Sequence, residues 1–155
     1  MQMLTKKSKY ALRALLALAK RHDQEPMLIA DLAEQEQIPR KFLELILLEL
    51  KNNGMLESKK GKGGGYLLRK KPDDISLGDV IRALDGPLAP LPCVSLSAHR
   101  KCDECDDEAT CGIRAVMKEV RDATATILDG QTLGDVMRRA EKMKYEHNKV
   151  LVYAI

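Results

Sequence analysis

Residues 37–69 read QIPRKFLELILLELKNNGMLESKKGKGGGYLLR, and these residues give the strongest indication of the fold class. Its first half predicts a helix over residues 39–53. Pro39 suits a first helical turn, where its missing N–H costs nothing, and Gly54 is typical of the residue just past a helix end. The inward face is apolar at helical spacing, through Leu43, Ile46, Leu47 and Leu50. The second half predicts a β-hairpin, because short extended segments at 55–58 and 66–69 flank a basic, glycine-rich tip.

Upstream of that stretch, the hydrophobic periodicity predicts two helices, residues 8–21 with Ser8 as the N-cap and residues 28–36. A short polar turn joins the second of these helices to the helix over 39–53. Two short helices, a tight turn, a third helix and a hairpin are the components of a winged helix-turn-helix, whose later helix enters the major groove of DNA. We therefore predict a mainly α fold with a small β-hairpin.

Downstream, Ser76 caps a short predicted helix over residues 77–84, and an irregular segment with three prolines follows. A long helix is predicted over residues 111–128, and a last helix over 132–144 is followed by an apolar tail, 150–153, that forms a strand or packs on the fold. The long helix carries an apolar seam that steps by three and four residues and suits pairing with another helix: Ile113, Val116, Val120, Ala123 and Ile127.

Three parts follow from this organisation: a winged helix-turn-helix DNA-binding domain over 1–86, a cysteine cluster loop over 87–111, and a dimerisation helix with the C-terminal segment over 112–155. No internal repeat is expected.

The chain has 155 residues, of which 45% are hydrophobic and 32% charged, which is typical of a soluble globular protein. Its apolar runs are too short for a membrane span and its N-terminus lacks a secretory signal, so we expect a cytoplasmic protein without a membrane partner.

The charge distribution favours a polyanionic partner. Residues 1–75 carry 15 Lys/Arg against 10 Asp/Glu, whereas residues 76–155 carry 11 against 13. No catalytic triad or paired-carboxylate pattern indicates an enzyme, and the Lys/Gly tip lacks the GxxxxGK[ST] spacing of a phosphate-binding loop. One Phe, four Tyr and no Trp weigh against stacking on single-stranded nucleic acid. Double-stranded DNA is therefore the expected partner.

Within the winged-helix interpretation, Arg40, Lys41 and Glu44 lie at the start of the recognition helix, where base edges and phosphates are reached, and a glutamate there can accept from cytosine. The wing offers Lys59, Lys60 and Lys62 to the DNA backbone or to a narrow minor groove, and its glycines allow close approach. The alternative from pattern alone is a small helical core with a solvated, charged hairpin.

Four motifs, in order, resemble the Rrf2 family of bacterial winged-helix regulators: KYALRAL at 9–15, IADLA at 29–33, KGKGGGY at 60–66, and ISLGDVI at 75–81 with LDGPL at 84–88. The resemblance spans roughly residues 1–145. It implies a homodimer held by the long helix, a palindromic operator contacted by two recognition helices and two wings, and a role as a transcriptional regulator, which we expect to be a repressor.

The resemblance also suggests roles for individual residues. Lys60 matches a wing arginine that inserts into the minor groove, and Glu44 matches a base-contacting glutamate. Pro39 and Lys41 replace serines of the IscR type, so a different DNA sequence is expected to be read. The GGGY wing motif adds Gly63, Gly64 and Tyr66 to the predicted DNA-binding set.

The second candidate site is a cluster of four cysteines with the spacing C-x8-C-x2-C-x5-C: Cys93, Cys102, Cys105 and Cys111. Thiolates bind zinc and iron–sulfur clusters, and a cytoplasmic cysteine cluster is more often metal-binding or redox-active than a disulfide pair. Structural zinc usually shows two close cysteine pairs, whereas this chain has one C-x2-C. Zinc, inert cysteines and a thiol/disulfide switch stay open as alternatives.

The family resemblance implies a 2Fe–2S or 4Fe–4S cluster at these cysteines, which we expect to be lost from protein prepared in air. The positions that supply a fourth ligand in two types of family member hold Lys9 and Arg114 here. Cys102 can complete an all-cysteine site, or an exchangeable small ligand does so; the nearby His99 is the weaker candidate. The remaining alternative is a CymR-like regulator without a cluster, which senses through a protein partner or thiol oxidation.

Overall fold

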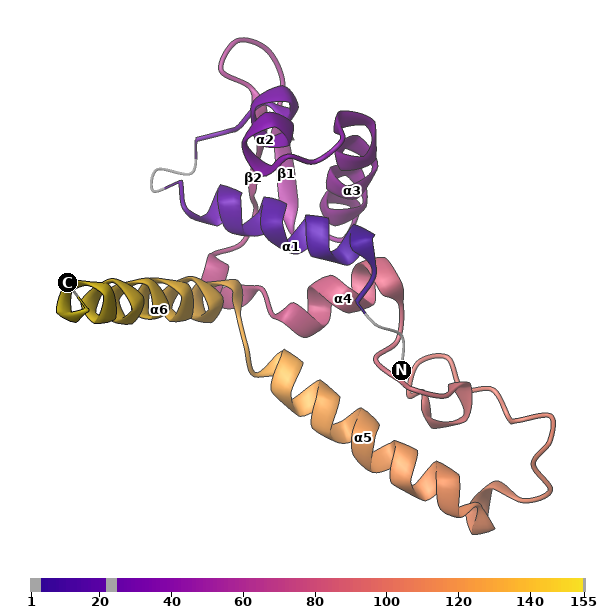
Figure 1. Cartoon of the computed structure of the whole chain (residues 1–155). Coiled ribbons are helices and arrows are strands. Elements are labelled where there is room, and N and C mark those ends of the chain that lie inside the picture. The colour runs from indigo at the N-terminus through magenta and orange to yellow at the C-terminus, as the bar shows by residue number, and fades with distance from the viewer. Residues whose placement is uncertain (1–3, 22–24, 155) are drawn as a thin grey trace.

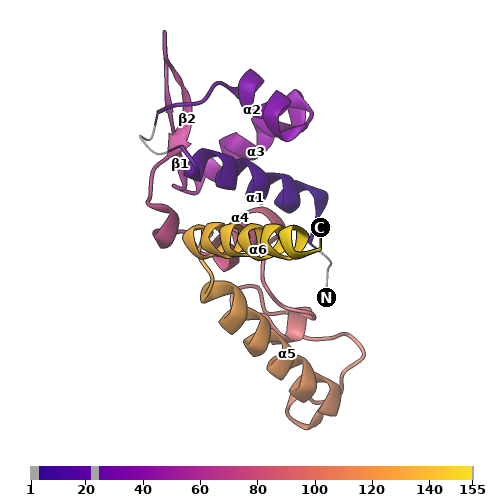
Figure 2. The same ribbon diagram turned by 60° about the vertical axis from the view of Figure 1, so that its left-hand side comes forward.

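The computed structural model describes residues 4–21 and 25–154 as a winged helix-turn-helix that is continued by two long helices (Figures 1 and 2). The helices are α1 Lys6–Ala19, α2 Ile29–Glu36, α3 Arg40–Asn52, α4 Leu77–Asp85, α5 Gly112–Asp129 and α6 Leu133–Tyr153. The strands are β1 Leu56–Lys59 and β2 Gly65–Leu68, and the short 3-10 turns are η1 Pro72–Asp74, η2 Pro92–Val94 and η3 Glu108–Thr110. The predicted bounds of α2 to α5 and of the hairpin agree with these to within one residue or two.

The N-terminal part has one apolar core, which packs α1, α2, α3 and α4 against the inner face of the hairpin. The four apolar positions predicted on α3 are all fully buried. The strands are antiparallel, with Leu56 opposite Leu68 and Lys59 opposite Gly65. Met27 extends the hairpin by pairing with Tyr66, which fixes the wing to the segment before α2. This arrangement confirms the predicted fold class.

The start of α1 differs from the prediction. Thr5, and not Ser8, is the N-cap, and its Oγ1 accepts from the Ser8 N–H at 3.2 Å. Ser8 lies in the first turn of the helix with a fully buried side chain. The choice between the two hydroxyl residues depends on a distant group, because Thr5 Oγ1 also donates to Asp85 Oδ1 at 2.5 Å, at the end of α4.

This Thr5–Asp85 contact should contribute measurably to stability. Partial burial raises the pKa of Asp85, but hydrogen bonds from Thr5 and the charge of Lys7 lower it by more, so the net pKa lies below the ordinary value. A lowered folded-state pKa means stability that is present above the unfolded pKa and is lost as pH falls through the folded one. We expect Asp85→Ala to cost about 1–2 kcal/mol at pH 7 and its difference from wild type to shrink below about pH 4.

Thermal unfolding at fixed protein concentration, measured from pH 3 to pH 7, tests this expectation. Glu57→Ala, which removes an exposed carboxylate from β1, is the matched control and should leave the melting temperature unchanged. An equal loss for Asp85→Ala at pH 3 and pH 7 would show that the carboxylate charge does not matter.

The C-terminal part leaves this core and returns to it. From α4 the chain runs out through the irregular segment 86–111, comes back along α5, and re-enters at Leu133, which is fully buried in the main core (Figure 1). None of the described helices is both long and apolar enough to cross a lipid bilayer. The division of the chain at residues 86 and 111 stays a prediction.

The predicted C-terminal tail is wrong. The last helix does not end near residue 144, and residues 150–153 are neither a strand nor packed on the fold, because α6 continues without a break to Tyr153. The outer part of α6, residues 145–153, projects away from the body and is exposed throughout, including Tyr145 and Tyr153 (Figure 1). A helix satisfies its own backbone hydrogen bonds, so the apolar tail residues need no neighbouring strand to remain ordered.

Candidate DNA interface and cysteine loop

The turn between α2 and α3 sets the direction of the predicted recognition helix. Gln37 has a left-handed backbone, with φ 53°, and its side-chain Nε2 donates to Glu34 O at 2.7 Å. The Ile38 N–H closes the turn by donating to Ala33 O at 2.9 Å, and the Ile38 side chain is buried. Pro39 is the N-cap of α3 and so stands one position before the predicted first turn. This tight, anchored turn is that of a helix-turn-helix.

The outer face of α3 carries the predicted contact residues. Arg40, Lys41 and Glu44 are all exposed, and Arg40 pairs with Glu44 at 3.4 Å. Leu45 and Leu48 lie on the same helix and are 65% and 50% exposed. The sequence interpretation missed them, although the run LELILLEL has more leucines than one buried face can hold. Exposed aliphatic side chains on a recognition helix can contact the methyl group of thymine.

The wing places its lysines at the same end of the molecule as α2 and α3 (Figures 1 and 2). Lys59, Lys60 and Lys62 are exposed, and Gly63 lies with them at the open tip. Five cationic side chains, two on α3 and three on the wing, therefore share one end of the fold, as a DNA backbone requires.

Two wing glycines have a structural role in addition to the predicted close approach to DNA. A Cβ on Gly64 would overlap the carbonyl of Lys59 across the loop, and one on Gly65 would overlap the carbonyl of Met27. Gly65 also has φ +136°, a conformation that other residues rarely adopt. Tyr66 follows with its backbone paired to Met27 and its half-buried ring packed against the core, so it anchors the base of the wing.

The four cysteines lie in the segment that connects α4 to α5 and in the cap of α5 itself. Cys93 is buried in η2, Cys102 is exposed, and Cys105 and Cys111 are half-buried. The Cys105 N–H donates to Cys102 O at 3.2 Å, which folds the C-x2-C pair into a turn. Partial desolvation, followed by the charges of Cys111 and Cys102, raises the pKa of the Cys105 thiol.

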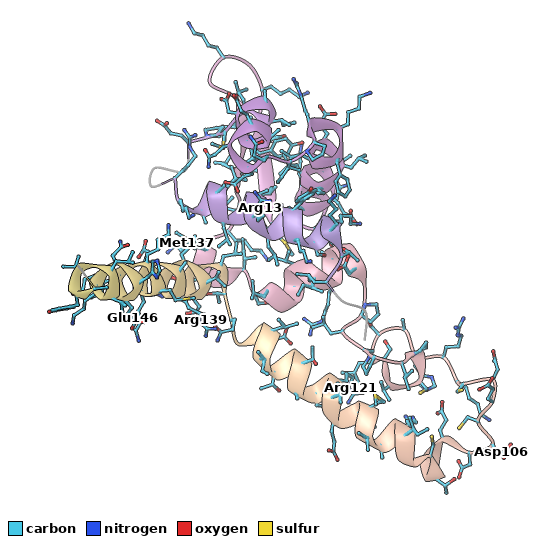
Figure 3. All side chains as sticks on the ribbon, viewed as in Figure 1. Arg13, Asp106, Arg121, Met137, Arg139 and Glu146 are labelled. Atoms are coloured by element: carbon cyan, nitrogen blue, oxygen red, sulfur yellow. The ribbon has the colours of Figure 1, made fainter. Side chains whose placement is uncertain are left out.

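Two arginines of α5 hold the first cysteine segment. Arg114 Nε donates to Cys93 O at 3.2 Å, and Arg121 Nη1 donates to Val94 O at 2.6 Å. Cys111 is the N-cap of α5, and its Sγ accepts from the Arg114 N–H at 3.4 Å. Figure 3 shows Arg121 where α5 passes this segment, and Asp106 at the far end of the loop. The cysteine loop is thus attached directly to α5 at both of its ends.

As the loop stands, no three Cys, His, Asp or Glu side chains within the described residues converge closely enough to hold a metal ion. The donor set itself fits a soft metal or an iron–sulfur cluster, because four thiols lie within one loop and thiolates are the ligands that such groups prefer. His99 is engaged elsewhere, with Nε2 3.2 Å from Glu108 Oε1. A cavity of about 740 Å³ is lined by residues 86–92 of the connecting segment and by Thr124 and Leu128 of α5, among others.

Comparisons with known proteins agree with this architecture. The profile of the family described as Rrf2, iron-dependent transcriptional regulator, matches residues 4–139. An Rrf2-like HTH-type transcriptional regulator of Rhodobacter capsulatus is 45% identical over 138 residues, 87% of this chain and 92% of that protein. The structure of CymR, the global cysteine regulator of Bacillus subtilis, is similar with a TM-score of 0.72 and 32% identity, covering 88% of this chain and 96% of that one.

The structure of IscR from T. potens is similar to the same extent, with a TM-score of 0.71 and 25% identity over 92% of this chain and 90% of that one. The relatives are transcriptional regulators and not enzymes, as predicted for this chain. Motifs, fold and relatives thus lead to one conclusion: the chain belongs to the Rrf2 family of DNA-binding transcriptional regulators.

Proposed function

We propose that this protein is a homodimeric repressor whose affinity for a palindromic operator is controlled by an iron–sulfur cluster held at the cysteine loop. The observation that carries the proposal is the pair of arginine contacts from α5 to the Cys93 segment, together with Cys111 as the cap of the same helix. Whatever binds the cysteines acts directly on α5. The family description as iron-dependent regulators supports the same conclusion.

The dimer part of the proposal rests on the outer face of α5. Ile113, Val116 and Ile127 of the predicted seam are 69%, 54% and 65% exposed. Aliphatic side chains in a straight row on one helix are typical of a surface that pairs with another helix. A second copy packed along this seam would give the assembly two recognition helices related by twofold symmetry, as a palindromic operator requires.

The DNA part rests on the shared end of α3 and the wing. Lys41, Leu45 and Leu48 supply one phosphate or base contact and two apolar contacts in the major groove, while the wing lysines follow the backbone. In the free protein, Glu44 is paired with Arg40, so the two residues must separate or move together when either one reads a base.

The cluster part rests on the four thiols. Cys93, Cys105 and Cys111 are the proposed ligands, with Cys102 as the fourth, and the cluster would supply a redox- and iron-responsive link between these positions. Arg114 and Arg121 transmit the position of the Cys93 segment to α5. A bound group can shift the operator affinity only by the difference in its own affinity for the two states of the protein.

The experiment compares protein purified without oxygen with the same protein after removal of iron. We expect stoichiometric iron and sulfide with a broad absorbance band near about 400 nm. The two forms should differ by about 5- to 150-fold in affinity for a duplex that the protein selects from a random DNA library. Equal affinities with a full iron content would leave a DNA-binding protein that the cluster does not control.

A second candidate function is a CymR-like regulator without a cluster. The observation in its favour is that Cys102 is exposed and that the described cysteines do not converge on a metal site as they stand. In that case the anaerobic preparation is colourless and free of iron. Oxidation of the thiols, or a protein partner, then changes the DNA affinity.

A further inference from the structure

A ten-residue pattern occurs twice in this chain, so the expectation of no internal repeat is wrong. Residues 73–82 and 129–138 share the pattern Asp-x-x-(Ser/Thr)-Leu-Gly-Asp-Val-x-Arg, with six of the ten positions identical. Each copy begins a helix, α4 in the first case and α6 in the second, and Ser76 and Thr132 are the N-caps.

The two copies pair with each other in antiparallel fashion. Ser76 and Thr132 form an isolated β-bridge. The Leu77 N–H donates to Gln131 O at 2.9 Å, and the Leu133 N–H donates to Ile75 O at 3.0 Å. These two hydrogen bonds join equivalent atoms of the two copies, so the junction has a local twofold symmetry within one chain.

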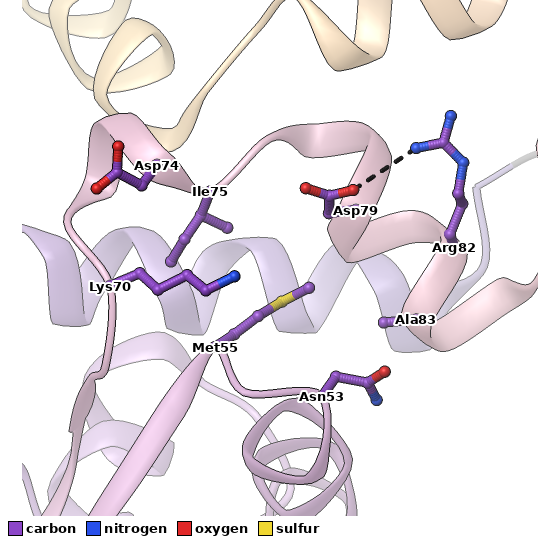
Figure 4. Close-up of a pocket in the computed structure, with 8 residues that line it drawn as sticks. All are labelled: Asn53, Met55, Lys70, Asp74, Ile75, Asp79, Arg82 and Ala83. Carbon is purple, nitrogen blue, oxygen red and sulfur yellow. Dashed lines mark ion pairs between the residues drawn. The ribbon is translucent and has the colours of Figure 1, made fainter.

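The side chains repeat the symmetry. Arg82 makes a two-pronged contact with Asp129, at 2.7 and 2.8 Å, and the equivalent Arg138 contacts Asp73 at 2.8 Å. Each arginine also contacts the aspartate three residues before it, Asp79 at 3.7 Å and Asp135 at 2.8 Å. Figure 4 shows Arg82 and Asp79 side by side at the rim of a pocket of about 400 Å³.

The glycines of the pattern have the same explanation in both copies. A Cβ on Gly78 would overlap the carboxylate of Asp129, and a Cβ on Gly134 would overlap the carboxylate of Asp73. Glycine therefore leaves room for the aspartate of the opposite copy to reach its arginine. We call the paired segments 73–82 and 129–138 the clasp.

The clasp closes a long excursion of the chain. The cysteine loop and α5 leave the DNA-binding core at the end of α4, and the chain rejoins that core at the clasp (Figures 1 and 2). The clasp therefore connects the core that carries α3 with the helix that carries the dimer seam. A single β-bridge can act as a hinge, whereas ion pairs on both sides of it resist rotation about that hinge.

We propose that the clasp is a positioning device that fixes α5 relative to α3 and so sets the half-site spacing that the dimer accepts. Arg82, Arg138, Asp73 and Asp129 are its positioning residues. This inference rests on the proposed function as a dimeric DNA-binding protein. One base pair of spacing moves a half-site by about 3.4 Å and rotates it by about 34°, so a small change in the angle of α5 alters the match.

The test uses the palindromic duplex that wild-type protein selects from a random library, two versions with one central base pair added or removed, and a single half-site. We expect wild type to bind the respaced duplexes about tenfold or more weakly than the selected one. Arg82→Ala/Arg138→Ala should bind the selected and respaced duplexes within about threefold of one another. Its affinity for the half-site should stay within about twofold of wild type, because α3 and the wing are untouched.

Two further variants make the result specific. Asp73→Asn/Asp129→Asn breaks the same ion pairs from the acidic side and should give the same loss of spacing preference. Lys142→Ala removes an exposed cation from α6 outside the clasp and should behave like wild type. If the alanine variant does not fold, Arg82→Lys/Arg138→Lys keeps the charges, loses the two-pronged contact to Asp129, and is expected to lose part of the preference.

The outcomes separate the two proposals. An unchanged spacing preference in folded arginine variants, or an equal loss on all duplexes including the half-site, overturns the positioning role. Failure of wild-type protein to select any duplex, or selection of a sequence without twofold symmetry, counts instead against the proposed function.

Discussion

Removal of all three wing lysines, Lys59→Ala/Lys60→Ala/Lys62→Ala, should lower operator affinity by about 100-fold or more at physiological salt. The three side chains are exposed at one tip, and the glycine-rich loop brings that tip to the same end of the fold as α3. Each phosphate contact that a lysine makes releases counterions, so its loss reduces both the affinity and the dependence on salt. The dimer loses six lysines in this variant, which should flatten the slope of log K against log salt by about 5.

The single variant Lys60→Ala separates groove contact from backbone contact. If Lys60 enters a groove, its loss should cost about 1–3 kcal/mol and relax the sequence preference at one position of the operator. If Lys60 only neutralises a phosphate, the affinity should fall equally on all sequences and the salt slope should change by about 2 for the dimer.

Fluorescence anisotropy on the selected duplex measures both the affinity and its dependence on salt. A range of roughly 50 to 300 mM salt is suitable, because phosphate contacts weaken over that range. Lys142→Ala again provides the control for Lys60→Ala, because it removes one charge from α6, away from the wing. A triple variant with wild-type affinity and slope would show that the hairpin is a solvated surface loop, the alternative that the sequence left open.

The parts of this structure that the sequence predicts correctly are those determined by neighbouring residues. The α3 helix and the hairpin follow from apolar spacing, from Gly54 past the end of the helix, and from the glycine-rich tip, all of which act within a few residues. The seam on α5 is predicted for the same reason. Features that depend on contacts between distant segments were predicted less well.

Three particular positions show the difference. Thr5 is favoured over Ser8 as the cap of α1 by Asp85, which lies 80 residues away in the chain. Gly78 and Gly134 are required by aspartates of the other copy of the repeat, and neither copy indicates this by itself. The path of the cysteine loop follows from arginines of α5 that contact backbone carbonyls, an interaction that leaves no periodic pattern in the sequence.

The second large effect is expected at the cysteines. Cys111→Ser should leave at least about tenfold less iron on protein purified without oxygen. Mutation of a residue that hydrogen-bonds to a metal ligand lowers metal affinity by about 10- to 100-fold, and loss of the ligand itself should cost no less. Serine at this position can still accept the Arg114 N–H, as Cys111 Sγ does at 3.4 Å. The helix cap is therefore kept, and the melting temperature of the iron-free variant should stay within about 2 °C of iron-free wild type.

The other cysteines decide how the cluster is completed. Cys93→Ser and Cys105→Ser should behave like Cys111→Ser, and Cys102→Ser should also lose its iron if all four thiols are ligands. The exposed position of Cys102 makes it the discriminating case. Full iron content in Cys102→Ser alone would show that an exchangeable ligand takes the fourth position. Full iron content in Cys111→Ser would show that this loop does not hold the cluster. Operator binding would then have to be controlled through thiol oxidation or a protein partner. The proposed roles of α3 and the wing in DNA binding would be unaffected.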